Sequence, residues 1–393
     1  MSRRRITEPA MPPSMQRVSG ETEKLRTGWT TGTCSAAAAK AAATALVTGE
    51  PQGKVEIKLP RKGEERRVGF DVERCEVGDS WTEAVVVKDA GDDPDVTDGA
   101  HMTARVSWRE EPGIELDRGE GVGRVTRPGL GLEVGGPAIN DVPRRMIQYS
   151  VEETLDPDER GVRVEIRVPG GEAMAEKTTN ARLGIIGGIS VLGTTGIVRP
   201  FSTASWRASV GQAVDVMGAQ DNGTFVLSTG GLTEKAAMRL LPDLEEICFI
   251  EVGDFTGHAM KKGLENGMRR VFFVGMAGKI SKLAAGVMMT HWTRSRVDNE
   301  LLAEITREAG GGEELTLQMH DANTARHAYE LWRDAGLNRA CNLVCERAAE
   351  CLNEYAGGGI EVHVILVDFD TLEPAGASAG ALDLTTFTDR ESG

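Results

Sequence analysis

Apolar residues in the second half of the chain come in short continuous runs, and longer stretches of mixed apolar and polar residues separate them. Such runs predict strands buried on both faces of a sheet, here Thr224–Ser228, Ile247–Val252, Val271–Val274 and Glu361–Val367. The stretches between them predict helices, including Thr233–Leu241, His258–Asn266 and a segment from Ser281 to about His291. This alternation is typical of a doubly wound sheet. We therefore predict an α/β Rossmann-like domain with a largely parallel sheet over residues 216–372.

The first half of the chain shows partial alternation of apolar and polar positions over segments that turn residues separate. This pattern predicts half-buried strands at Lys54–Leu59, Arg67–Val72, Glu83–Lys88, His101–Trp108 and Gly161–Val168. An alanine-rich helix is expected after Thr30, and another near Val142. Together these elements predict an α+β domain with a mixed sheet over residues 25–215. We expect residues 1–24 to form a disordered tail and residues 373–393 a flexible one.

Length and charge narrow the class of protein. A chain of 393 residues exceeds the usual size of one hydrophobic core, which supports two domains. The formal net charge of −15 argues against non-specific binding to nucleic acid or to an anionic membrane. The sequence contains neither an apolar signal segment near its start nor an apolar run long enough to span a membrane. Its six cysteines form no C-x-x-C pair, so we expect free thiols and a cytoplasmic protein.

The segment Leu183–Val198 is uncharged, apolar and rich in glycine. Because glycines destabilise helices, this pattern predicts buried strands and turns where the backbone closely approaches another backbone or a ligand. Thr194 and Thr195 lie between two of its glycines, and Arg199 follows it. Glycine loops with cations at their rim suit an anionic small molecule, which makes these three residues candidate substrate ligands.

A second glycine-dense segment, Gly119–Asn140, carries Arg124 and Arg127. Guanidinium groups match carboxylates and phosphates in geometry, so both arginines are candidate substrate ligands. The alternative interpretation is a pair of hairpins with arginines on their surface.

Two other segments each allow a functional and a structural interpretation. Thr30–Ala39 places hydroxyl groups at a helix N-terminus, which either binds an anion or is capped by Thr33 or Ser35. Lys88–Gly99 concentrates aspartates, whose spacing does not match an EF-hand loop. These carboxylates either hold the loops of a site or form a solvated turn.

The turns after the expected parallel strands contain candidates for a cofactor site. The candidates are small residues after the first and third strands and an acidic residue at the end of the second: Thr229, Gly230, Gly231, Gly275, Gly278 and Glu251. Small residues allow ribose or phosphate to approach the backbone, and an acidic residue about 20 positions further on commonly binds ribose hydroxyls. Since the G-x-G-x-x-G and P-loop spacings are absent, the pattern favours an adenosine-type ligand in general terms.

The sequence contains no histidine spacing typical of a metal site and no G-x-S-x-G nucleophile motif. We therefore expect no metal bound by the protein itself and no covalent catalysis. The pattern of residues identifies no catalytic side chain.

Five long segments, in chain order, resemble one protein family: LRTGWTTGTCSAAAAKAAA, VVVKDAGDDPDVTDGA, GEGVGRVTRPGLGLEVGGPAINDVPRRMI, KTTNARLGIIGGISVLGTTGIVRPFS and GKISKLAAGVMMTH. They are similar to the cobalt-precorrin-5B C-1 methyltransferases, the CbiD-like enzymes of anaerobic cobalamin (vitamin B12) biosynthesis. The resemblance implies methyl transfer from S-adenosylmethionine to C-1 of a cobalt tetrapyrrole, giving cobalt-precorrin-6A. The cobalt would belong to the substrate rather than to the protein.

Under this resemblance the arginine and threonine candidates would bind the polycarboxylate tetrapyrrole, and the candidates beside the strands would bind S-adenosylmethionine. The chain departs from the family at two points. Met276 stands where the family commonly has a histidine, and His291–Trp292 stands where it often has His-Ser. A catalytic role for the first of these histidines would therefore not transfer. Neighbouring enzymes of the pathway are candidate partners, and the oligomeric state stays open.

Two hypotheses from other classes compete with this one. A small-molecule kinase of the GHMP type would use Thr30–Ala39 as its phosphate loop and would bind ATP with Mg²⁺. A non-catalytic tetrapyrrole-binding protein would show affinity for the macrocycle without any dependence on S-adenosylmethionine.

Overall fold

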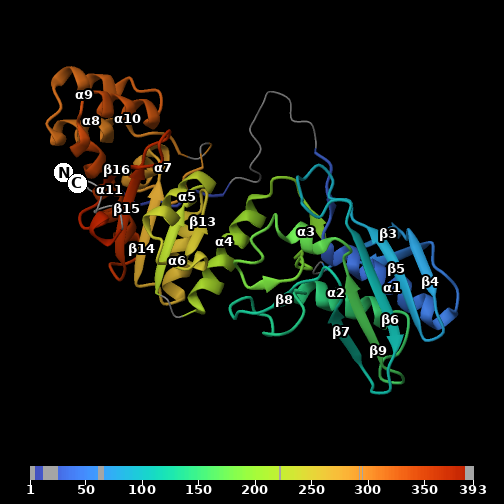
Figure 1. Ribbon diagram of the computed structural model, residues 1–393. Coiled ribbons are helices and arrows are strands. Elements are labelled where there is room, and N and C mark those ends of the chain that lie inside the picture. Colours follow the sequence, from blue (N-terminus) through green and yellow to red (C-terminus); the bar gives the residue numbers. More distant parts are fainter. Residues whose placement is uncertain are drawn as a thin grey trace. The chain divides into compact units, whose positions relative to one another are not determined.

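The computed structural model describes residues 5–11, 25–60, 66–220, 223–291, 293 and 295–385. The chain divides between Ser202 and Thr203 into two compact units (Figure 1). We call residues 25–202 the glycine-rich unit, and residues 203–385 with residues 5–11 the parallel-sheet unit. The domain limit predicted at residue 215 falls inside helix α4 (Thr203–Gly218), which belongs to the parallel-sheet unit. Both units combine helices and strands, so the molecule is a mixed α/β protein.

The main sheet of the glycine-rich unit is mixed. Its strand order is β4-β5-β6-β9-β7, with antiparallel pairing except between β7 and β9, which are parallel. Strands β4 and β7 were not predicted, because these segments are short and rich in charged residues. The strands are β4 (Arg74–Val77), β5 (Trp81–Val87), β6 (His101–Trp108), β7 (Ile114–Arg118) and β9 (Val162–Arg167).

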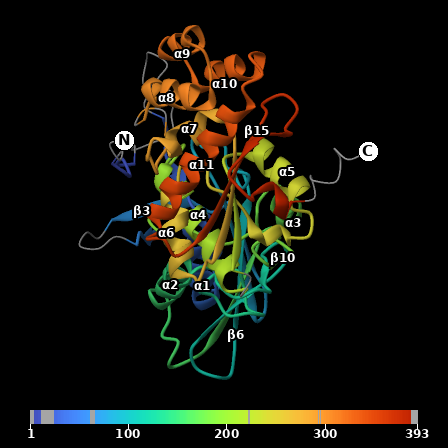
Figure 2. The same ribbon diagram turned by 90° about the vertical axis from the view of Figure 1, so that its left-hand side faces the viewer.

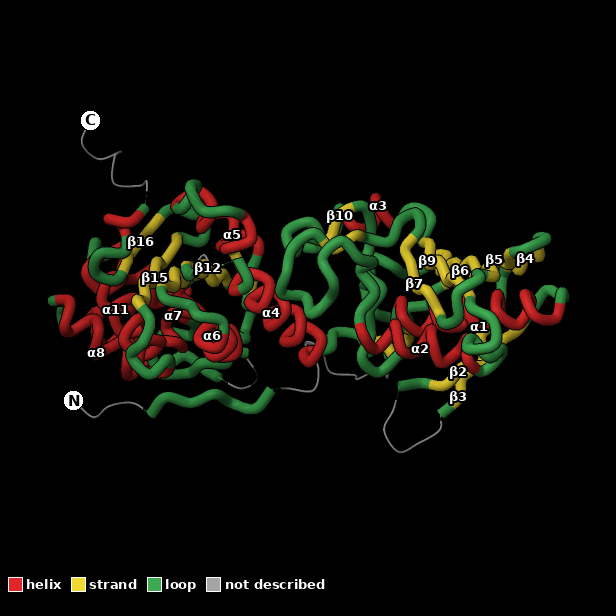
Figure 3. The backbone as a smooth tube through the Cα atoms, turned by 90° about the horizontal axis from the view of Figure 1, so that it is seen from below, coloured by secondary structure: helices red, strands yellow, loops and turns green. Residues whose placement is uncertain are grey.

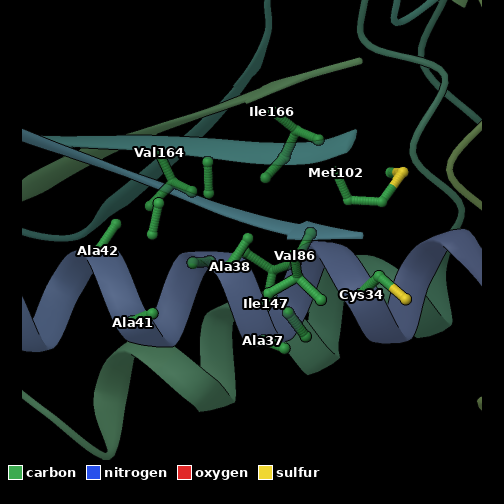
Figure 4. Packing of buried hydrophobic residues seen from close by; sticks show 14 of the residues in the cluster. Cys34, Ala37, Ala38, Ala41, Ala42, Val86, Met102, Ile147, Val164 and Ile166 are labelled. Carbon is green, nitrogen blue, oxygen red and sulfur yellow. The ribbon is translucent and has the colours of Figure 1, made fainter. Parts of the chain in front are cut away.

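Helices α1 (Thr31–Thr48) and α2 (Asp141–Glu152) form a layer between this sheet and a ribbon of two strands, β2 (Lys54–Lys58) and β3 (Arg67–Asp71) (Figure 3). The alanines of α1 are buried, and their small side chains let the helix lie close to the strands. Figure 4 shows them beneath Val164 and Ile166 of the sheet, with Ile147 of α2 beside the same helix. This cluster is the core of the glycine-rich unit.

Glycines in the same unit bring backbone segments into direct contact. A Cβ atom on Gly121 would lie 1.8 Å from the carbonyl oxygen of Val168, and one on Gly188 would lie 2.2 Å from that of Gly121. The close backbone approach predicted for Leu183–Val198 is therefore confirmed, and β10 and β11 are its strands, but the segment is not buried throughout, since Ile186 and Leu192 are half exposed. Two short antiparallel pairs, β1 with β11 and β8 with β10, frame this segment. The elements are β1 (Gly28–Trp29), β8 (Arg124–Val125), α3 (Gly171–Ala175), β10 (Ile185–Ile186) and β11 (Ile197–Val198).

The sheet of the parallel-sheet unit has the strand order β13-β12-β14-β15-β16, and pairing is parallel except at the edge strand β16. The chain runs from β12 to one neighbour and then to the other, so the winding direction reverses beside β12. Helix α5 packs on one face, and α6, α7 and α11 lie on the other (Figure 3). The strands are β12 (Thr224–Ser228), β13 (Phe249–Glu251), β14 (Arg270–Gly275), β15 (Glu361–Val367) and β16 (Pro374–Ala377).

Helices α4 and α9 were not predicted, and helix α7 has other bounds than those predicted. The helix expected from Ser281 to about His291 instead ends at Ala284, since Gly286 adopts a left-handed φ of 80°. Helices α8, α9 and α10 gather at one end of the unit (Figure 2), and none of the described helices is both long and apolar enough to cross a membrane. The helices are α5 (Gly231–Leu240), α6 (Thr256–Glu265), α7 (Ala277–Ala284), α8 (Asn299–Ala309), α9 (Glu313–His320), α10 (Ala325–Asp334) and α11 (Asn338–Tyr355).

Residues 5–11 lie along the parallel-sheet unit, which corrects the prediction of a disordered tail for this stretch. Thr7 forms a bridge with Val287, and its amide donates to the carbonyl of Gly286 at 2.8 Å. The Glu8 carboxylate accepts hydrogen bonds from Lys261 and from the Tyr355 hydroxyl. Backbone and charged contacts hold the segment in place. Its sequence therefore shows no apolar periodicity that would predict an ordered element. Residues 1–4 and 12–24 of that prediction lie outside the described residues.

The flexible tail predicted for residues 373–393 also needs correction. Residues 374–377 form the edge strand β16, and Gly376 packs so tightly that a Cβ atom would lie 2.6 Å from Cys341 of α11. The glycine and alanine content that suggested a tail instead permits this close packing of strand on helix. Residues 386–393 lie outside the described residues.

Candidate functional site

The cofactor candidates of the parallel-sheet unit meet at the carboxyl ends of its strands. Ser228, the last residue of β12, is in register with Glu251 of β13 on one side and with Val274 of β14 on the other. Thr229 and Gly275, which follow directly, therefore lie at the same edge as Glu251. In open sheets ligands bind at this edge, where the winding direction reverses.

The turn from Thr229 to Gly231 is held by the Thr233 hydroxyl. This oxygen accepts hydrogen bonds from the amides of Thr229 at 3.0 Å and Gly230 at 3.1 Å, and it donates to the Gly230 carbonyl at 2.8 Å. The turn leads into helix α5, whose N-terminus favours electron-rich ligand groups. A Cβ atom on Gly230 would lie 4.0 Å from Oε1 of Glu251, so the turn and the carboxylate face a common space.

The two glycines around α7 differ in their roles. A Cβ atom on Gly275 would lie 2.9 Å from the ring of Phe273, so packing within the sheet already requires glycine there. Gly278 is exposed in the first turn of α7, with nothing within 4 Å of an added Cβ atom. Met276 is the half-buried residue at the N-cap position of this helix.

Sequence reasoning missed a charged cluster at the same edge. Asp254, three residues after Glu251, forms an ion pair with Lys279 of α7 and accepts a hydrogen bond from the Thr290 hydroxyl at 3.0 Å. Lys282, one turn further along α7, is buried and donates to the Thr290 carbonyl at 2.9 Å. The sequence does contain a signal that could have revealed this cluster: two lysines lie three residues apart on a helix that follows a glycine turn.

His291 lies beside this cluster in sequence and is buried. Its Nδ1 lies 2.8 Å from the Thr293 hydroxyl and 3.3 Å from the Thr293 amide. Since an amide only donates, Nδ1 accepts there and the ring proton of a neutral His291 sits on Nε2. Trp292, which the sequence analysis singled out beside it, lies outside the described residues.

The N-terminus of α1 is closed by its own chain, which favours capping over anion binding. The Thr30 hydroxyl accepts from the Thr33 amide at 3.2 Å, while the Gly32 amide donates to the Leu192 carbonyl at 3.0 Å. The Thr33 hydroxyl donates to the Gly196 carbonyl at 2.7 Å. Two segments singled out in the sequence, Thr30–Ala39 and Leu183–Val198, thus serve each other as backbone partners.

The substrate candidates of the glycine-rich unit fall at the two ends of Leu183–Val198. Arg124 pairs through its backbone with Ile186, and Arg127 packs on Gly184, where a Cβ atom would lie 2.6 Å from the arginine Cγ. At the other end are Thr194, Thr195 and Arg199, all exposed, on both sides of β11. The structure brings each group together locally.

The aspartates of Lys88–Gly99 hold loops rather than forming a solvated turn. Asp95 pairs with the fully buried Lys88 at 2.8 Å. Burial alone would raise the pKa of Asp95, but the hydrogen bonds from Lys88 and Thr97 lower it overall. Asp93 accepts from the amide of Phe201 at 2.9 Å. These carboxylates therefore attach the chain just after Leu183–Val198 to the loop before β6.

The chain matches known proteins over nearly all of its length. The family model described as CbiD matches residues 18–200, and the model described as CbiD, C-terminal domain, matches residues 289–376. A Rubrobacter xylanophilus protein named cobalt-precorrin-5B C(1)-methyltransferase is 72% identical, over 98% of this chain and 99% of its own. A Salinispora arenicola protein of the same name is 62% identical, over 88% and 90%. A crystal structure of the cobalamin biosynthesis protein CbiD from Archaeoglobus fulgidus shares 25% identity and a TM-score of 0.36, covering 77% of this chain and 95% of that one.

The fold defines a mixed α/β protein with a polar site at the carboxyl edge of a parallel sheet. The two family models and the close relatives then settle the family. The chain belongs to the CbiD family.

Proposed function

We propose that this protein transfers a methyl group from S-adenosylmethionine to C-1 of cobalt-precorrin-5B, which gives cobalt-precorrin-6A in cobalamin biosynthesis. The observation that carries the proposal is the 72% identity, over 98% of the chain, to a cobalt-precorrin-5B C(1)-methyltransferase. The match covers both units of the described fold.

The parallel-sheet unit is the Rossmann-like half of the enzyme and binds S-adenosylmethionine. The fit rests on the donor set at its carboxyl edge, where the Glu251 carboxylate faces the turn at Gly230. Glu251 accepts hydrogen bonds from the ribose hydroxyls, while Thr229, Gly230 and Gly231 let the nucleoside approach the backbone. Gly275 and Gly278, which lie at the start of the next strand-to-helix connection, are further contacts for the cofactor.

The glycine-rich unit supplies cations for the carboxylates of the tetrapyrrole. Arg124, Arg127 and Arg199 bind these carboxylates, and the hydroxyls of Thr194 and Thr195 add hydrogen bonds. The support is their placement on a framework that tight glycine packing makes rigid, since rigid elements position ligands well. The cobalt ion arrives with the substrate.

S-adenosylmethionine, when bound, supplies an already activated methyl group. The protein therefore needs no covalent intermediate, and its residues accelerate the reaction by holding C-1 in line with the methyl–sulfur bond. Glu251 and the turn at Thr229–Gly231 would hold the methyl donor, which would supply the methyl group and leave as S-adenosylhomocysteine with the loss of its sulfonium charge. Polar groups fixed at the carboxyl edge stabilise this shift of charge. No side chain is assigned as a base.

The protein acts in the cytoplasm and hands its product to neighbouring enzymes of the pathway. Support for a reducing compartment comes from its cysteines, all of which are free thiols. The kinase alternative loses its main support, because the amides of Gly32 and Thr33 at the start of α1 donate to the protein's own oxygen atoms.

Calorimetric titration separates the three hypotheses. We expect the protein to bind S-adenosylhomocysteine, which is the product form of the methyl donor. We expect no binding of a non-hydrolysable ATP analogue with Mg²⁺. Binding of the ATP analogue alone would support the kinase. Binding of a cobalt tetrapyrrole with no response to S-adenosylhomocysteine would support the non-catalytic binder.

A further inference from the structure

The cluster of Asp254, Lys279 and Lys282 carries more positive charge than its own residues neutralise. It holds two ammonium groups and one carboxylate, since Asp254 pairs with Lys279 while Lys282 donates to a neutral carbonyl. The Lys282 side chain is only 9% exposed, and in the described part of the chain its one hydrogen bond goes to Thr290. A buried ammonium without a counter-charge is costly, so the cluster is electrostatically incomplete.

The electrostatics of Lys282 agree with this imbalance. Burial lowers the pKa of its ammonium group, and the nearby charge of Lys279 lowers it further, while Asp254 only partly compensates. An anion beside Lys282 would supply the counter-charge that its ammonium group lacks. A carboxylate does so, because it carries a negative charge and its two oxygens accept charge-assisted hydrogen bonds from ammonium groups.

The cluster is also open on one side and adjoins the proposed adenosine site. The Asp254 and Lys279 side chains are 14% and 29% exposed, so a ligand can reach them. Asp254 follows Glu251 by three residues, which places their Cα atoms within roughly 10 Å of one another, and Lys279 follows Gly278 directly. A ligand that lies across both places therefore carries an anionic group a short distance from its ribose.

We infer that Lys279 and Lys282 bind the carboxylate of the methionine part of S-adenosylmethionine, and that Asp254 binds its ammonium group. Within the described residues both contacts of the Asp254 carboxylate use Oδ1, so Oδ2 can accept from that ammonium. The two opposite charges of the amino-acid end thus meet two lysines and one aspartate. This inference rests on the proposed function, because it names further residues of the same cofactor site.

The test compares two ligands that share the adenosine and differ in the amino-acid end. S-adenosylhomocysteine carries the carboxylate and the ammonium, whereas 5′-methylthioadenosine carries neither. On the unaltered protein, calorimetry should show S-adenosylhomocysteine binding about tenfold or more tightly, as expected for charged hydrogen bonds. Equal affinities would overturn the inference. Binding of neither ligand would overturn the proposed function, and the inference with it.

The matching variants locate the effect. Lys282→Met and Asp254→Asn should weaken S-adenosylhomocysteine by about tenfold and leave 5′-methylthioadenosine unchanged. Lys261→Met is the control, since it breaks an ammonium–carboxylate pair with Glu8 elsewhere in the unit. Variants that bind both ligands like the unaltered protein would overturn the assignment. If a variant does not fold, the comparison of the two ligands on the unaltered protein still decides.

Discussion

The fold itself does not require a glycine at position 230. Its φ of 171° is extended backbone that any residue adopts, and an added Cβ atom would have only Glu251 Oε1 nearby, at 4.0 Å. Gly275 differs, because a Cβ atom there would collide with Phe273. We therefore attribute the glycine at 230 to the approach of the ligand.

Replacing Gly230 with valine should separate binding from stability. We expect Gly230→Val to weaken S-adenosylhomocysteine by tenfold or more in calorimetry, since the side chain would fill the space before Glu251. The free energy of unfolding should fall by about 0.5–2 kcal/mol, the usual range for a changed helix N-cap. Gly359→Val is the control, because a Cβ atom at Gly359 meets nothing within 4 Å and lies away from Glu251 in sequence. Unchanged binding in Gly230→Val would contradict our placement of the nucleoside.

A substitution of Arg199 tests the proposed binding of the tetrapyrrole. Its side chain is exposed at the end of β11, and we assign it to a carboxylate of the tetrapyrrole. Arg199→Ala should weaken tetrapyrrole binding more than S-adenosylhomocysteine binding, with a loss of about 1.5–3 kcal/mol for the charged hydrogen bond. Arg145→Ala, an exposed arginine of α2, serves as the control. The reverse ranking of the two ligands would refute the assignment.

At the scale of elements, one carboxylate joins three parts of the glycine-rich unit. Glu153, which caps α2, accepts from Lys40 of α1 at 2.6 Å and forms an ion pair with Arg67 of β3. Burial alone would raise the pKa of Glu153, but the hydrogen bonds from Arg67 and Lys40 outweigh it and lower the pKa to about 2. The ionised form is therefore the one that stabilises the fold.

This lowered pKa predicts a stability that depends on pH. The contribution of Glu153 is complete above its unfolded value of 4.5 and disappears as the pH falls towards about 2. Glu153→Gln should lower the free energy of unfolding by about 1–3 kcal/mol at pH 7, and the difference should shrink at pH 3. Urea unfolding at both pH values measures it, with the exposed Glu50→Gln as control. A difference of the same size at pH 3 would show that the ion pairs contribute nothing.

The elements that sequence patterns predicted are those in which side-chain burial follows a period. The continuous apolar strands β12, β14 and β15 and the alternating strand β6 appear close to their expected positions. Strand β7 and residues 5–11 were missed because backbone and charged contacts with distant parts of the chain hold them. Helix α7 ended early because a glycine in the left-handed region outweighed the helical periodicity around it.

In the molecule as a whole, the sequence predicts which turns share the carboxyl edge of the parallel sheet, but it does not predict the charged cluster beside them. The turns at Thr229 and Gly275 follow apolar strands, so the edge they share with Glu251 could be inferred from topology alone. The cluster of Asp254, Lys279 and Lys282 could not, because its members come from different elements and only the fold brings them together. Likewise, the closure of α1 by Leu192 and Gly196 depends on contacts between residues about 160 positions apart.

The most direct test of the account is methyl transfer itself. The purified protein is incubated with cobalt-precorrin-5B and S-adenosylmethionine carrying a ¹³C-labelled methyl group, and the products are analysed by mass spectrometry and NMR. We predict one labelled methyl at C-1 for each S-adenosylhomocysteine formed, without any need for ATP. An unchanged tetrapyrrole under conditions where both ligands bind, or a label at another carbon, would contradict the account.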